Sequence, residues 1–264
     1  MLFSYSPDCP TARLPGHADM NKGALLTELM ARLSGGKIRA GLIPALLLPA
    51  LLLTVALARP AVAAEALLRV DIGAPHDAPP DGWDVKEWKG KAEFEVVKDG
   101  DCTAVHLMSD RSSGALYKEM DFDIRDFPVL HWKWKAEKLP AGADVRFKHK
   151  DDQAAQIYVI FPKWPALVNS RVIGYIWDTT APAGAFIPST KSSNTRYVVI
   201  RSGPDGLGQW FTEQRNVYED YKKSFNEEPP PVGKVSVMID SDDMASTAES
   251  YFSDIYFSKT AEQP

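Results

Sequence analysis

The sequence predicts a mostly β protein, an antiparallel β-sandwich of jelly-roll type with one helix near residues 212–225. Three observations lead to this fold class. Apolar and polar side chains alternate along short segments, as at Leu130, Trp132 and Trp134. Turn-forming residues separate these segments, for example the Gly-Pro-Asp-Gly stretch at 203–206. Helical spacing is found in a single segment, within the C-terminal third of the chain.

About ten segments have the composition and period of strands. Most alternate between apolar and polar residues, whereas 157–161 is apolar throughout, as in a strand covered on both faces. In chain order the predicted strands are 67–72, 94–97, 105–108, 115–120, 130–134, 157–161, 171–177, 196–201, 235–239 and 251–257. The connection at 178–194 is long and rich in Pro, Ser and Thr, and connections of this length are often functional.

The predicted helix has an apolar stripe and suitable ends. Val217, Tyr221 and Phe225 fall on one face at helical spacing. Thr212 can cap the first turn, and two lysines stand in the last turn, where the helix dipole favours positive charge. We therefore expect the helix to begin at Thr212.

The N-terminal part predicts export. An apolar run at 40–58 follows Lys37 and Arg39 and precedes a small-x-small pattern that ends at Ala64. These are the three regions of a cleavable signal peptide. The alternative is a retained membrane anchor, since a spanning helix needs ~20 apolar residues. The helix-breaking Pro60 and the small-residue pattern favour cleavage, and we expect a periplasmic or secreted protein with no stable membrane anchor afterwards.

These signals divide the chain into three parts. We expect residues 1–36 to be an over-extended or disordered N-terminus, because a better signal peptide starts at Met30. Residues 37–64 are the predicted signal peptide. Residues 65–264 are the predicted single β-sandwich domain. The chain has a formal net charge of −5, which disfavours binding to nucleic acid.

Four segments together resemble a known family. In order along the chain they are 130–135 (LHWKWK), 151–161 (DDQAAQIYVIF), 213–221 (EQRNVYEDY), and 239–243 (IDSDD) followed by 248–257. Their order and spacing are similar to a family of exported bacterial proteins, domain of unknown function three-zero-four-seven, over roughly residues 66–258. The chain departs from the family pattern at Gln156, where the family has an arginine. The resemblance implies the fold and export, and it implies no chemistry.

The last of these segments also resembles the closing strands of galactose-binding-like and other carbohydrate-binding sandwiches. In those proteins an acidic turn leads into a Tyr-Phe-x-Asp-Ile strand, which this chain has at 251–255. This resemblance implies a fold of the same kind.

Asp240, Asp242 and Asp243 follow a predicted strand and form the first candidate site. Carboxylates at this spacing can supply the hard oxygen ligands that Ca²⁺ prefers. The segment does not follow the EF-hand pattern, because Met244 stands where that pattern needs a ligand. The alternative is a strand-end turn capped by Asp side chains.

Asp151 and Asp152 precede the most apolar strand and form the second candidate site. Two adjacent carboxylates repel each other unless a positive group is near. Lys148, Lys150, Arg215 or a metal could supply that charge. We favour Arg215, because Arg215 and Asp220 are five apart on the predicted helix and diverge there. Asp151, Asp152 and Asp220 are therefore either structural ion-pair partners or carboxylates of a site.

Aromatic side chains supply the third candidate site. Flat aromatic faces stack on the apolar faces of sugars, and nearby polar groups bind the hydroxyls. Trp132 and Trp134 share one face of a strand and could form such a platform. The alternative is that they pack in the core. The predicted ligand-binding residues are Trp132, Trp134, Tyr158, Trp177, Arg215 and Asn216.

Motifs for catalysis are missing from the sequence. It has no Gly-x-Ser-x-Gly, His-Glu-x-x-His or phosphate-binding loop. The favoured hypothesis is an exported, non-catalytic domain that binds a glycan or another envelope component. One alternative is a hydrolase or lyase that acts on polysaccharide through carboxylates such as Asp151, Asp152 and Glu213. The other is an envelope interaction or structural protein.

Overall fold

A computed structural model describes residues 67–261 of the chain. The predicted signal peptide, its cleavage site and residues 1–36 lie outside the described residues. Within the described part, no helix combines the length and the apolar character that crossing a membrane would require.

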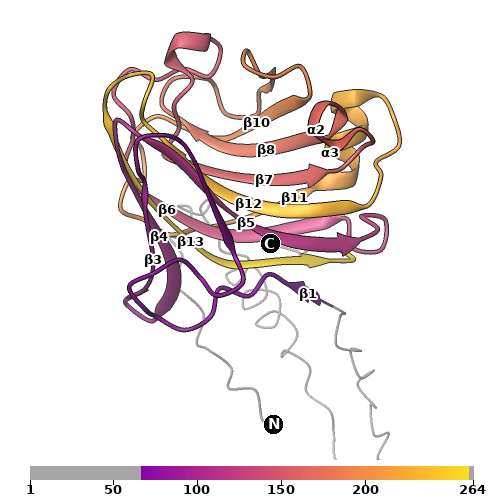
Figure 1. The fold of residues 1–264 in the computed structure, drawn as a ribbon, viewed down its shortest axis with the longest axis horizontal. Helices are drawn as coiled ribbons and strands as arrows, with labels where there is room; N and C mark the ends of the chain where they lie inside the picture. Colours follow the sequence, from indigo (N-terminus) through magenta and orange to yellow (C-terminus); the bar gives the residue numbers. More distant parts are fainter. Residues whose placement is uncertain (1–66, 262–264) are drawn as a thin grey trace, which may run out of the picture. The chain divides into compact units, whose positions relative to one another are not determined.

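Two β-sheets form the fold (Figure 1). Sheet A has six strands: β1 (Leu67–Arg69), β3 (Glu93–Asp99), β4 (Cys102–Asp110), β6 (Val129–Lys138), β11 (Phe211–Asn216) and β13 (Thr247–Ser258). Sheet B has seven: β2 (Asp84–Lys89), β5 (Ser113–Phe122), β7 (Ala155–Phe161), β8 (Arg171–Asp178), β9 (Phe186–Pro188), β10 (Thr195–Ser202) and β12 (Val232–Asp240). The helical elements are η1 (Lys148–Lys150), α2 (Ala166–Asn169) and α3 (Val217–Phe225).

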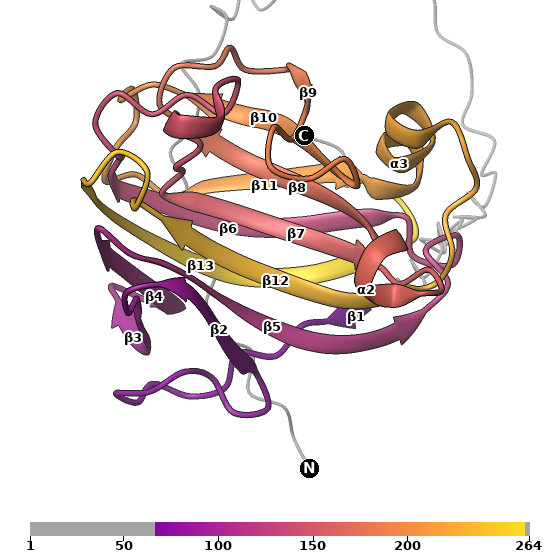
Figure 2. The same ribbon diagram turned by 45° about the horizontal axis from the view of Figure 1, so that its top comes forward.

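The strand order confirms the predicted sandwich. Sheet A runs β11-β6-β13-β4-β3, with β1 on β13, and sheet B runs β2-β5-β12-β7-β8-β10-β9. Figure 2 shows sheet B in front of sheet A, with α2 at one end of β7 and β12. Pairing is antiparallel except between β8 and β10, which run parallel. The 178–194 connection makes this parallel pair possible, because it carries the chain back to the start of β8 and forms β9 on the way.

The core lies between the two sheets and contains the tryptophans predicted to bind ligand. Trp132, Trp134 and Trp177 are all 0% exposed. Trp132 stacks on Tyr175 with ring centroids 5.4 Å apart, and Trp134 lies 5.9 Å from Trp177. The predicted platform is therefore wrong: the alternation of β6 is real, but its apolar face packs against sheet B and a ligand cannot reach it.

The predicted helix is present in its second half. Residues 211–216 pair with β6 as strand β11, and α3 begins at Val217. Asn216, rather than Thr212, caps it: the Asn216 side chain accepts a hydrogen bond from the Glu219 backbone N–H at 3.0 Å. Edge pairing with β6 satisfies the backbone of 211–216 more fully than an exposed first turn would, which explains the later start.

Candidate functional site

A groove of about 560 Å³ runs over the outer face of sheet B, the face turned away from sheet A. Strand alternation creates it. Val235, Val237 and Ile239 of β12 point into the core, and the side chains between them, Ser236 and Met238, line the groove.

Strand register places three tyrosines in one row across the floor of this groove. Tyr117 of β5 is opposite Ser236, which is opposite Tyr158 of β7. Tyr158 is opposite Gly174, and Gly174 is opposite Tyr197 of β10. Because neighbouring strands lie ~4.8 Å apart, this row of five residues extends about 19 Å at right angles to the strands. All three tyrosines line the groove.

Gly174 allows the tyrosines to pack closely. A Cβ atom at this position would come within 2.3 Å of the Tyr158 ring and 3.1 Å of the Tyr197 ring. The two rings are 6.4 Å apart, centroid to centroid. Burial raises the pKa of Tyr158 well above its usual value and that of Tyr197 to about 12, so both hydroxyls stay protonated and can donate hydrogen bonds.

Tyr158, one of the predicted ligand-binding residues, therefore lies in the groove. Its hydroxyl donates to Gln156 Oε1, and the Gln156 amide donates to the Gln153 carbonyl at 3.2 Å. Gln156, the position that departs from the family pattern, thus forms part of the groove lining.

Trp88 is a groove residue that the sequence analysis missed. It lies on the edge strand β2, is 53% exposed and lines the groove. The Lys86 ammonium lies over its ring, 5.1 Å from the centroid. The sequence of β2, DVKEWK, does not alternate between apolar and polar residues, and every residue of the strand is exposed. The sequence therefore contains no sign of which side chains face the groove. Pairing of β2 with β5 is what brings Trp88 there.

The two acidic candidate sites meet at one end of the groove. The Asp152 carboxylate accepts hydrogen bonds from the backbone N–H groups of Asp243 (3.1 Å) and Met244 (2.7 Å). Oxygens of Asp152, Asp242 and Asp243 lie within 4.8 Å of one another. The predicted metal trio of Asp240, Asp242 and Asp243 is thus regrouped, with Asp152 in the place of Asp240, while Asp240 lines the groove.

Lys191 is the cation of this acidic end. Its ammonium lies 2.6 Å from an Asp243 carboxylate oxygen and donates to the Asp151 carbonyl at 3.2 Å. Arg215, the expected partner of Asp151 and Asp152, lies elsewhere. Lys191 comes from the 178–194 connection, and it reaches these carboxylates only because that connection passes over sheet B.

Burial and mutual repulsion raise the carboxylate pKa values at this end. Burial, and next the Asp152 charge, raise the pKa of Asp240 to about 9. Burial raises the pKa of Asp151 to about 6, opposed by its hydrogen bond from Gln153 and by the Lys191 charge. For Lys191, burial opposes the charge, but the hydrogen bond to Asp243 and the nearby carboxylates raise the pKa overall.

Arg215, Asn216 and Asp220 contribute to the fold rather than to the groove lining. Arg215 donates twice to the Asp220 carboxylate, at 2.9 and 2.6 Å. The expectation that these two diverge is wrong, because Arg215 lies on β11 and only Asp220 lies on the helix. Tyr175 also donates to Asp220, at 2.9 Å, so the pair fastens α3 to β8. Glu213 binds Arg201 at 2.6 Å and does not line the groove.

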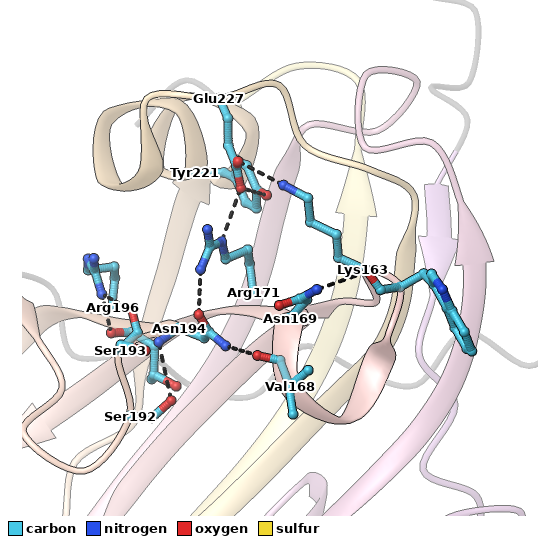
Figure 3. A network of polar contacts seen from close by, with 12 residues as sticks. Lys163, Val168, Asn169, Arg171, Ser192, Ser193, Asn194, Arg196, Tyr221 and Glu227 are labelled. Carbon is cyan, nitrogen blue, oxygen red and sulfur yellow. Dashed lines mark hydrogen bonds and ion pairs between the residues drawn. The ribbon is translucent and has the colours of Figure 1, made fainter.

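A polar network holds the other end of the groove (Figure 3). Glu227, just beyond α3, accepts from Lys163 at 2.8 Å, from Arg171 at 3.1 Å and from Tyr221 at 2.9 Å. Arg171 also donates to Asn194, which donates in turn to the Val168 carbonyl of α2 at 2.5 Å. The network links the start of β8 to α2 and to the segment before β10. Ser192 of that segment and Thr195, the first residue of β10, line the groove.

The family of the chain follows from comparison of its sequence with family models. The model described as Protein of unknown function (DUF3047) matches residues 81–256, which include the groove, its acidic end and α3. The chain belongs to the DUF3047 family. The resemblance drawn from the four sequence segments is thereby confirmed. A search of curated proteins finds no match.

Solved structures similar to this DUF3047 chain include two carbohydrate-binding modules and a xylanase. The family 30 module of a Clostridium thermocellum cellulosomal cellulase is 11% identical, with 75% of this chain and 99% of that chain covered and a TM-score of 0.43. The family 11 module of Lic26A-Cel5E from the same organism is 8% identical, with 69% and 90% covered and a TM-score of 0.39. The family 11 xylanase of Neocallimastix patriciarum is 10% identical, with 70% and 91% covered and a TM-score of 0.34.

Proposed function

We propose that this DUF3047 chain is an exported domain that binds a glycan chain in the groove of sheet B. The observation that carries the proposal is the row Tyr117, Tyr158 and Tyr197 across the groove floor, with the exposed Trp88 at its edge. Aromatic rings offer apolar faces for the C–H faces of sugar rings, and Tyr117, Tyr158 and Trp88 are at least partly exposed here. Tyr197, which is 7% exposed, packs beside Tyr158 and supports its ring.

A polar group beside this row can bind sugar hydroxyls. Lys86 is exposed and lies in the next row, whereas Ser236 and Gln156 are buried in the groove floor. Specific ligand sites combine apolar contact area with a few placed donors and acceptors, which this arrangement provides. The tyrosine row spans about 19 Å across the strands, at ~4.8 Å per strand, a distance that accommodates several sugar units rather than one.

Affinity electrophoresis through gels with embedded polysaccharides tests the proposal on protein expressed from the full-length sequence. We expect retardation by at least one neutral or envelope glycan, and Trp88→Ala should weaken it. Trp164→Ala is the matched control, because Trp164 is 88% exposed but does not line the groove. Absence of retardation across a broad panel, or equal loss in both variants, would count against a glycan in this groove and favour an envelope interaction role.

A polysaccharide hydrolase is the second candidate, favoured by one observation. Asp151 and Asp240 line the same groove as the tyrosines, and glycosidases act with two carboxyl groups on either side of the scissile bond. Release of reducing ends from a retarding glycan, lost in Asp151→Asn, would establish hydrolysis. Retardation with no product would establish binding without catalysis.

A further inference from the structure

Trp164 is the most exposed tryptophan of the chain, and the groove does not account for it. Five of the seven tryptophans are at most 7% exposed. Trp88 is 53% exposed but lines the groove. Trp164 is 88% exposed and lies outside the groove lining. Burial of so large an apolar ring would be favourable, and the surroundings of Trp164 indicate what could bury it.

The residues that follow Trp164 extend it into a small apolar surface at the start of α2. Pro165 and Ala166 are exposed, and Val168 is 61% exposed. We call these four residues, Trp164, Pro165, Ala166 and Val168, the α2 tip. Single exposed apolar side chains are ordinary on a protein surface, whereas neighbouring ones that form a patch mark a contact with a partner or a membrane.

Hydrogen bonds hold the α2 tip in this conformation. The Asn169 side-chain amide donates to the Trp164 carbonyl at 2.9 Å. From the segment before β10, the Asn194 amide donates to the Val168 carbonyl (Figure 3). The indole is therefore presented on a fixed turn, and little backbone entropy is lost when it meets a surface.

Cationic side chains lie around the α2 tip. We call three of them, Lys163, Arg171 and Arg196, the basic collar. Lys163 precedes Trp164, and the guanidinium groups of Arg171 and Arg196 lie 5.1 and 5.0 Å from the centroid of the same Phe225 ring. Glu227 accepts from Lys163 and Arg171, while Arg196 donates only to backbone carbonyls among the described residues. Three cations thus share one carboxylate, which leaves the collar positive.

Area and charge together favour a lipid surface over a protein as the partner. A stable protein interface buries ~800 Å² on each side. A tryptophan buries only ~150–250 Å², and the other residues of the α2 tip are smaller. A shallow lipid contact needs no comparable area, because an indole enters the headgroup region and nearby cations contact anionic headgroups.

We propose that the α2 tip inserts shallowly and reversibly into a lipid surface with anionic headgroups, and that the basic collar contacts those headgroups. The contact has a consequence for the groove, which ends at α2, since Ala166 and Ser170 line it. It holds the groove beside the membrane, where an envelope glycan is displayed. Only this last consequence rests on the proposed function.

Quenching of Trp164 fluorescence by lipids with brominated acyl chains tests the proposal on the full-length chain. An apolar run such as 40–58 binds lipid on its own, so the signal must come from Trp164 alone. That signal is the emission of the wild type minus the emission of Trp164→Phe. We expect vesicles of brominated phosphatidylcholine and phosphatidylglycerol to quench it and shift it to shorter wavelength, and brominated phosphatidylcholine alone to do so much less.

Two further variants sharpen the result. Trp88→Phe is the matched control, because the Trp88 signal comes from the groove and should not be quenched. Arg196→Gln should raise the lipid concentration for half-maximal quenching of Trp164 about fivefold, since it removes one cation from the anionic surface.

The contrary outcomes are distinct. No quenching of Trp164 in either kind of vesicle, or equal quenching of Trp88, would overturn the lipid contact at the α2 tip and favour a protein partner. Equal quenching of Trp164 with and without phosphatidylglycerol would overturn the role of the basic collar. Because the assay contains no glycan, its failure leaves the glycan proposal standing, and gel retardation without lipid tests that proposal alone.

Discussion

The two faces of sheet B carry aromatic side chains in contrasting environments. On the inner face, Tyr175 and Trp177 pack on Trp132 and Trp134 of sheet A with no exposed surface. On the outer face, Tyr117 and Tyr158 lie in a groove with part of each ring accessible. Both rows follow from the same two-residue period. Strand alternation therefore sorts aromatic residues into two sets, and the packing of a second sheet decides which set forms the core.

Truncating a core tryptophan should have the largest effect on stability. Trp134→Ala removes a ring that contacts Trp132, Trp177 and Phe252, and should lower the free energy of unfolding by about 3–5 kcal/mol. Urea unfolding measures this. Trp164→Ala, at an 88% exposed site, should change it by less than about 0.5 kcal/mol. Similar costs for both would contradict the assignment of Trp134 to the core.

Adding a methyl group to the groove floor should have the next largest effect on stability. Gly174→Ala places a Cβ atom 2.3 Å from the Tyr158 ring, so the ring must move, at a cost of about 1–3 kcal/mol. We expect a lower midpoint of urea unfolding and a loss of glycan retardation. Gly184→Ala is a contrasting variant: its Cβ has nothing within 4 Å, and any cost there comes from its positive φ alone. Wild-type retardation by Gly174→Ala would show that the Tyr158 ring position does not matter for binding.

Removing a groove aromatic should affect binding far more than folding. Tyr117→Ala takes away one ring of the row and should weaken glycan affinity about tenfold, for a loss of ~1.4 kcal/mol. Its melting temperature should change much less than that of Trp134→Ala. A variant that binds normally but unfolds early would reverse the comparison and place Tyr117 with the structural residues.

The smallest effect concerns the network at the far end of the groove. Hydrogen bonds from Lys163, and also from Arg171 and Tyr221, lower the pKa of Glu227 from 4.5 to about 2. A depressed carboxyl pKa stabilises the fold above the unfolded-state value and loses this contribution as the pH falls from 4.5 towards 2. Melting temperatures of the wild type and Glu227→Gln should therefore differ at pH 6 and converge near pH 2. A difference that stays constant over this range would contradict the ionised role of Glu227.

Several strands and the helix could be predicted from the sequence, because the residue patterns that indicate them lie within short segments. The period of two at Leu130, Trp132 and Trp134 and at 235–239 predicted strands, and those strands are present as β6 and β12. The helix was predicted from its apolar stripe, but its start was placed five residues early, because edge pairing of 211–216 with β6 depends on distant residues. The tryptophan platform failed for the same reason, since the sequence shows that a face is apolar but not what covers it.

Patterns within short segments suffice to predict the sandwich class, the family and the two acidic motifs. The fold is needed to bring Asp152 to Asp242 and Asp243, to carry Lys191 to them, and to align Tyr117, Tyr158 and Tyr197 in one row. These contacts join residues far apart in the chain through strand order and register. Register is set by hydrogen bonding and core packing over the whole sheet, and no local pattern contains it.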